Sequence, residues 1–132
     1  MFYILCILTF SWFIFMTWLS HQDGEHTRKT SGALAKKLSF LNPNSDVLNM
    51  ELRKAAHTIL FLIFAILLGV TLKLGSLPMW FLLFAVLWSY IDEATKPWIQ
   101  GRHFSWFDVG LNLFGVAIGC FVLWIIHIIL EI

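Results

Sequence analysis

The stretch "RKAAHTILFLIFAILLGVTL", residues 53–72, decides the fold class, because three ionisable residues at its start give way to an almost uninterrupted apolar run. A helix needs roughly 20 residues to cross a hydrocarbon core about 30 Å thick. The whole chain agrees with a transmembrane interpretation. Its 132 residues are 59% hydrophobic and 13% charged, whereas soluble domains carry about a quarter charged residues. The sequence therefore predicts a membrane protein.

Three further apolar segments extend this pattern. Residues 1–19 lack the basic start and the small-residue cleavage site of a signal peptide, so we expect a retained span. In the third segment, Pro78 falls in the first helical turn, where its missing N–H costs little. We predict one all-α, polytopic membrane domain over residues 1–132. Its four transmembrane helices are expected at 1–19, 55–72, 77–91 and 109–130.

The loop before the second span is predicted to hold a short helix in the membrane interface. In "SGALAKKLSFL" (31–41), three leucines share one stripe and both lysines fall off it. Pro43 then breaks the chain, and one of residues 44–46 is expected to cap a new helix. That helix is predicted to run through residues 47–54 directly into the second span.

The third span ends in an adjacent acidic pair, Asp92 and Glu93. A helix from Leu77 to Ile91 would cover only about 22 Å, less than the roughly 30 Å of hydrocarbon. We therefore expect both carboxylates at or below the hydrocarbon boundary. Charges at that depth are costly and normally find partners, so they indicate a functional site.

Candidate partners occur at the start of the second span and in the loop before the fourth. Arg53, Lys54 and His57 share one helix face, with the histidine between the two cations. A neutral imidazole is expected there, able to act as a base. Arg102 precedes the fourth span and is expected to fold back over the same point.

The fourth span carries a polar and then small stripe made by Asp108, Asn112, Gly115 and Gly119. The two glycines are spaced to allow close helix approach. The polar half of the stripe lies toward the same side as the acidic pair. We therefore predict that polar groups of the last three spans converge at one depth.

In order and position, these elements resemble the VanZ-like membrane protein family, named for a teicoplanin-resistance protein. The shared pattern consists of "SHQDG" (20–24), "RKAAH" (53–57), "DE" (92–93), "GR" (101–102), and Asp108 with the asparagine and glycines after it. The resemblance covers nearly the whole chain. No single motif identifies the family, but all five in this order relative to the spans do. It implies a multi-pass protein of the bacterial cytoplasmic membrane, associated with the cell envelope and sometimes linked to lipoglycopeptide antibiotic resistance.

Two departures from the family pattern stand out. Residues 58–61 are "TILF", where the family often has an aromatic residue, a glutamate and a tyrosine. Residues 94–96 are "ATK", where a His-Gln pair often follows the acidic residues. If those side chains carry chemistry in the family, this chain lacks it or does something different.

Orientation is predicted in two opposite ways. Eight of the nine Lys and Arg residues fall on the face that carries loops 20–54 and 92–108. The positive-inside rule would make that face cytoplasmic. Resistance to an extracellular drug, which the resemblance implies, would suit an outward face. Both orientations stay open.

The predicted site is expected to bind or process an anionic envelope lipid or an envelope-directed amphiphile, because arginine binds phosphate through two hydrogen bonds. His57 with Asp92 or Glu93 is the candidate acid–base group, and whether the protein is an enzyme stays open. The alternatives are internal ion pairs with a purely structural role and a small dimeric transporter. The expected ligand-binding residues are Arg53, Lys54, His57, Asp92, Glu93, Arg102, Asp108 and Asn112, with Gln22 if its loop folds back.

Membrane lipids are the expected partners, together with a second copy of the chain if the protein is a homo-oligomer. No nucleic acid is expected, since the net charge is only +1. No cofactor is expected. A metal held by His57, Asp92, Glu93 and Asp108 is conceivable, but the nearby Arg and Lys residues argue against it, so none is predicted.

Overall fold

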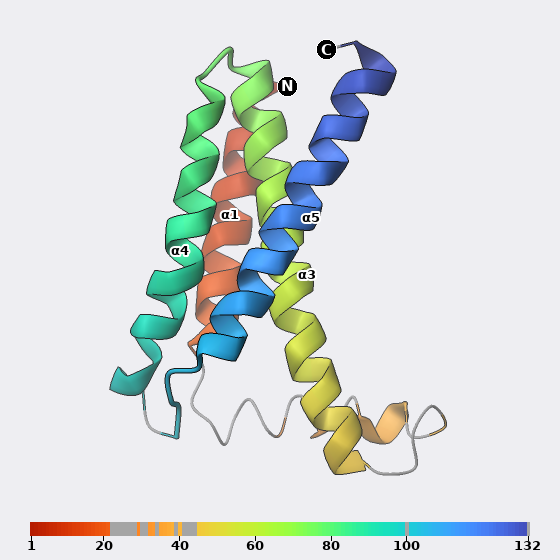
Figure 1. Cartoon of the computed structure of the whole chain (residues 1–132), viewed down its shortest axis with the longest axis vertical. Coiled ribbons are helices and arrows are strands. Elements are labelled where there is room, and N and C mark those ends of the chain that lie inside the picture. The colour runs from red at the N-terminus through yellow and green to blue at the C-terminus, as the bar shows by residue number, and fades with distance from the viewer. Residues whose placement is uncertain are drawn as a thin grey trace.

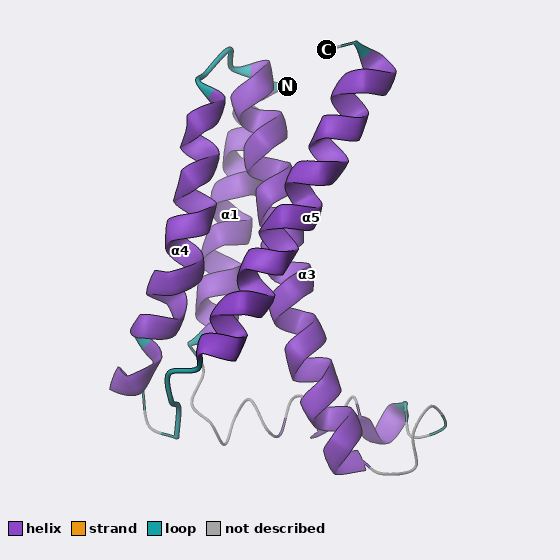
Figure 2. Cartoon of the chain, in the orientation of Figure 1, coloured by secondary structure: helices purple, strands orange, loops and turns teal. Residues whose placement is uncertain are grey.

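Every secondary-structure element of the computed structural model is helical over the described residues, which are 1–21, 29, 32–33, 35–38, 40, 45–99 and 101–131. Helices joined by short loops are all that Figure 2 shows there. The all-α prediction is confirmed. The elements are α1 (Phe2–Ser20), α3 (Ser45–Leu74), η1 (Met79–Leu82), α4 (Leu83–Ala94), η2 (Lys96–Trp98) and α5 (Trp106–Leu130).

Three of these helices are long and apolar enough to cross a membrane: Phe2–Ser20, Glu51–Leu74 and Trp106–Leu130. They match the spans predicted at 1–19, 55–72 and 109–130. The span predicted at 77–91 folds as η1 followed by α4. The 12 residues of α4 cover about 18 Å, so a fourth crossing stays a prediction.

Helix α3 is continuous over 30 residues and begins at Ser45. This confirms that the helix predicted at 47–54 runs directly into the second span. The interfacial helix predicted at 31–41 includes positions outside the described residues, among them Leu34 and Leu41, and stays a prediction.

The two chain termini lie at the same end of the bundle, and α3 crosses α5 at an angle (Figure 1). Helix α3 is central, since it packs against α5, α1, η1 and α4. Indole Nε1 of Trp12 on α1 donates to the carbonyl of Leu60 on α3 at 3.1 Å. The buried core of the bundle consists of Met16, Phe61, Phe64, Ala65, Ala85 and Val116.

Two glycines of α5 allow this helix to approach α3 closely. A Cβ at Gly115 would lie 2.2 Å from the backbone oxygen of Thr58, and one at Gly119 would lie 2.9 Å from that of Leu62. The Thr58 hydroxyl also donates to the carbonyl of Leu111 at 3.3 Å. The predicted small-residue contact is confirmed, and it brings the polar ends of α3 and α5 together.

Candidate functional site

A cluster of buried charges lies at the end of the bundle opposite the termini, where α1 and α4 end and α5 begins (Figure 1). Asp92 and Glu93 in the last turn of α4 are 0% exposed, and Lys96 in η2 is 1% exposed. The carboxylates at 92 and 93 therefore point into the protein and not into solvent.

Asp92 joins α1 to α4. Its Oδ2 accepts a hydrogen bond of 2.6 Å from the Ser20 hydroxyl at the end of α1. Nδ1 of His21 lies 3.6 Å from Oδ1, and Nζ of Lys96 lies 3.8 Å from Oδ2. The other ring nitrogen of His21 is 2.6 Å from the Thr95 hydroxyl. Through these contacts Asp92 connects the end of α1 to the end of α4.

Glu93 and Lys96 form a buried pair within one turn. The Lys96 ammonium donates to Oε1 of Glu93, and a spacing of three residues places both side chains on one face. The second carboxylate oxygen, Oε2, is buried and accepts no hydrogen bond from any residue that the structure describes.

Helices α3 and α5 bring a third set of polar groups to the same place. Nε2 of His57 lies 3.8 Å from Oδ2 of Asp108. Asp108 lies in the first turn of α5, where its N–H bonds the capping Ser105 hydroxyl at 3.3 Å. One turn later, Nδ2 of buried Asn112 donates to the carbonyl of Ser89 on α4 at 3.3 Å. The polar stripe of the fourth span thus faces α3 and α4.

Arg102 completes the cluster from the loop before α5. It is 8% exposed. Burial lowers the pKa of its guanidinium, and the positive charge of Arg53 lowers it further. Attraction to Glu93, Asp108 and Asp92 opposes both effects. Arg102 therefore lies within electrostatic range of all three acids and of a second arginine.

The structure brings together most, but not all, of the predicted site residues. Arg53 is at the exposed edge of the cluster. Lys54 turns away, with its ammonium 5.0 Å from the centre of the Phe107 ring. Gln22 lies outside the described residues. The residues that meet are His57, Asp92, Glu93, Arg102, Asp108 and Asn112.

Lys96, Ser20 and His21 belong to the cluster but were not among the predicted site residues. A signal for Lys96 was present in the sequence, because it stands three residues after Glu93 and four after Asp92, the spacing of helical ion pairs. Ser20 and His21 begin the motif "SHQDG", but the motif does not show that they contact α4, because that contact depends on α1 packing beside α4.

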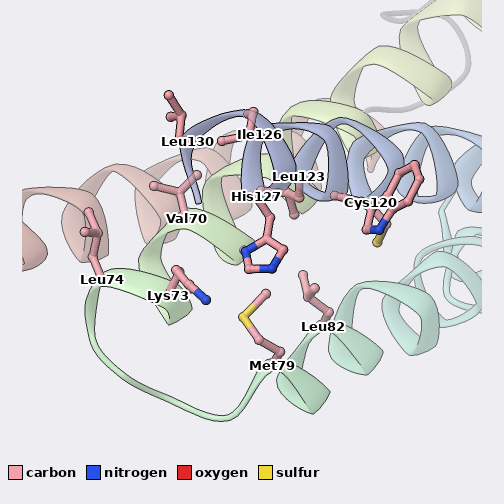
Figure 3. Close-up of a pocket in the computed structure, with 12 residues that line it drawn as sticks. Val70, Lys73, Leu74, Met79, Leu82, Cys120, Leu123, Ile126, His127 and Leu130 are labelled. Atoms are coloured by element: carbon pink, nitrogen blue, oxygen red, sulfur yellow. The ribbon is translucent and has the colours of Figure 1, made fainter. Parts of the chain in front are cut away.

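A second feature, a mainly apolar hollow of about 590 Å³, lies between α3, η1 and α5. Lys73 and His127 direct their side chains toward it, beside Met79 and Leu82 (Figure 3). It is near the end of the bundle that carries the chain termini, so it is separate from the charged cluster.

Three apolar helices of membrane-crossing length and a buried charged cluster at one end define a multi-pass membrane protein. The sequence matches the VanZ/LLP1 family over residues 1–127, so the chain belongs to this family. The resemblance drawn from the motifs is confirmed. No curated protein and no solved structure matches the chain.

Replacing Ser20 with alanine is expected to lower the free energy of unfolding by about 1.5 kcal/mol, the lower end for hydrogen bonds to a charged group. The change removes the 2.6 Å bond to Asp92. Detergent unfolding followed by tryptophan fluorescence measures it. Ser11→Ala, at an exposed position of the same helix, is the control and should stay within about 0.5 kcal/mol of wild type. Equal effects of the two changes would show that the Ser20–Asp92 bond does not join α1 to α4.

Proposed function

We propose that this protein binds the anionic headgroup of an envelope lipid, or of an envelope-directed amphiphile, at the charged end of its bundle. The observation that carries the proposal is the pair of arginines. Arg53 on α3 and Arg102 before α5 are close enough for one charge to act on the other. A phosphate held by both guanidiniums through paired hydrogen bonds would relieve that repulsion.

The surroundings of the cluster support a position at the headgroup level. Trp98 and Trp106, on either side of Arg102 in the sequence, are 84% and 70% exposed. Phe107 is also exposed. Aromatic side chains of this kind are enriched where a membrane meets water. A lipid bound by its headgroup there would keep its chains in the bilayer.

The proposed setting is the bacterial cytoplasmic membrane, with η1 and α4 together crossing as a fourth helix. This topology would keep both termini on one side, as their common end of the bundle requires (Figure 1). We include a role in resistance to teicoplanin-type lipoglycopeptides in the proposal. A protein that holds an anionic envelope lipid would change how much drug reaches its target at the membrane.

A structural role is the second candidate, and the contacts of Asp92 favour it for part of the cluster. Asp92 contacts Ser20, His21 and Lys96, which accounts for the burial of its Oδ2, whereas its Oδ1 is buried with no hydrogen-bond partner among the described residues. This explanation does not extend to Arg53, whose side chain is at the exposed edge. The two candidates therefore predict different behaviour for the arginines.

Native mass spectrometry of the purified protein with phosphatidylglycerol, with a polyprenyl phosphate and with phosphatidylcholine tests the proposal. We expect the two anionic lipids to bind and phosphatidylcholine not to. Arg53→Ala combined with Arg102→Ala should weaken anionic lipid binding by about 10-fold to 100-fold, since a hydrogen bond to a charged group contributes about 1.5–3 kcal/mol.

Lys54→Ala is the matched control, because Lys54 neighbours Arg53 but lies over the Phe107 ring. It should leave lipid binding within about threefold of wild type, as expected for a charge outside the site. Unchanged phosphatidylglycerol binding by the double arginine variant would overturn the proposal. An equal loss in Lys54→Ala would overturn it too, because attraction would then be general and not confined to a site.

A further inference from the structure

We propose that His57, Glu93 and Asp108 form a binding site for a divalent transition-metal cation, with Zn²⁺ the best match. A ring nitrogen of His57 and one carboxylate oxygen from each acid all lie within 4.8 Å of one another. The three residues come from three different elements, α3, α4 and α5. The fold therefore builds the group by tertiary packing.

The spacing of the three donors suits a shared ion. Metal–ligand bonds of about 2.0–2.2 Å place two donors on one ion roughly 3 to 4.4 Å apart. Nε2 of His57 and Oδ2 of Asp108 are 3.8 Å apart, inside that range. The remaining separations, at most 4.8 Å, need only small side-chain rotations to close.

An independent observation points to a ligand at this place. Oε2 of Glu93 is buried and has no hydrogen-bond partner among the residues that the structure describes. Its other oxygen accepts from Lys96. A buried carboxylate oxygen without a partner is rare and costly. In the proposed site Oε2 is the oxygen that Glu93 would give to the cation, since Oε1 already accepts from Lys96.

Two of the cations that argue against a metal have partners of their own. Lys96 binds Oε1 of Glu93 and lies near Asp92, and Lys54 lies over an aromatic ring. Three acids, Asp92, Glu93 and Asp108, face the buried cations Lys96 and Arg102, and Arg53 at the exposed edge brings the formal charge of the cluster to zero (three minus three). The proposed metal site therefore depends on the geometry of its donors and not on an excess of negative charge.

The donor set selects the class of ion. An imidazole nitrogen suits Zn²⁺ better than the purely oxygen-binding ions Mg²⁺ and Ca²⁺. Three protein donors leave at least one coordination position open, as in zinc sites that take a further ligand. If the proposed function is also correct, a lipid phosphate oxygen would take that position beside Arg102. The metal site itself does not depend on the lipid.

Isothermal titration calorimetry with ZnCl₂ tests the inference. The protein is solubilised in detergent and stripped of metal with a chelator, and bound metal is counted by elemental mass spectrometry. We expect one Zn²⁺ per chain, micromolar or tighter, and no comparable binding of CaCl₂. His57→Ala and Asp108→Asn should each weaken Zn²⁺ binding at least about tenfold. Asp108→Asn is nearly isosteric, so it still tests the site if His57→Ala misfolds. Circular dichroism verifies the fold of both variants.

His127→Ala is the matched control, since His127 lies in another part of the bundle, at the apolar hollow. It should bind Zn²⁺ as wild type does. Absence of stoichiometric Zn²⁺ binding, or equal loss in His127→Ala, would overturn the site. The arginine double variant separates the two proposals. If the double variant still binds Zn²⁺ but no longer binds phosphatidylglycerol, both proposals are supported. If the wild-type protein binds phosphatidylglycerol but not Zn²⁺, only the metal site is rejected.

Discussion

Replacing Lys96 with methionine is expected to destabilise the protein by about 3–5 kcal/mol, the usual cost of removing one partner from a buried ion pair. Lys96 donates to Glu93, and its ammonium lies 3.8 Å from Asp92. Both carboxylates are fully buried, so the variant would leave two acids without their common cation. Methionine keeps the unbranched apolar stem, which limits the loss of packing. Unfolding in mixed micelles of dodecyl sulfate and dodecyl maltoside, followed by tryptophan fluorescence, measures the change.

Two further variants separate charge from packing at this position. Lys96→Met combined with Glu93→Gln should recover a large part of the loss, because one orphaned charge is removed. Lys54→Met should cost no more than about 1 kcal/mol, as an exposed contact with an aromatic ring is worth that much at most. A Lys96→Met protein as stable as Lys54→Met would show that the buried cluster does not stabilise the bundle.

The long helices were predictable because lipid permits few alternatives. In a bilayer every backbone polar group must be satisfied within the segment, so a long apolar run must be a helix. The run at 109–130 was predicted three residues short, because Trp106 and Asp108 look like loop residues although Ser105 caps the helix before them. The 77–91 segment was harder, since its first turn is η1 and not regular α-helix.

The site was most directly predictable where one helix supplies the spacing. Asp108 and Asn112 stand four residues apart, so their shared face follows from helical geometry alone. Lys54 shows the limit of that reasoning. Its position on α3 is near that of His57, but its long side chain lies over Phe107 of the crossing helix instead. Lys96 has the spacing of a helical ion pair with Asp92 and Glu93, but it was missed because the third span was predicted to end at Ile91, whereas α4 and η2 continue the coil to Trp98.

Replacing Gly115 with leucine is expected to destabilise the protein by about 3 kcal/mol, at the upper end for overpacking. A Cβ there would lie 2.2 Å from the Thr58 carbonyl oxygen and 3.1 Å from the Leu62 nitrogen. Both neighbours are backbone atoms, so the clash is relieved only if α3 and α5 move apart. That movement would separate His57 from Asp108. The same micellar unfolding measures stability, and calorimetric Zn²⁺ titration measures the second effect as weaker binding.

Gly110→Leu is the control on the same helix, because a Cβ at Gly110 meets nothing within 4 Å. Leucine is the better helix former, so this variant should be neutral or up to about 1 kcal/mol more stable. A stable Gly115→Leu protein would mean that α3 and α5 can move apart without loss, and close approach at Gly115 would then not be what holds His57 beside Asp108. If Gly115→Leu and Gly110→Leu were equally destabilised, the cause would be leucine on α5 in general. A large loss of stability and of Zn²⁺ binding in Gly115→Leu alone would instead show that one helix contact, two turns away from Asp108, holds the charged cluster in its geometry.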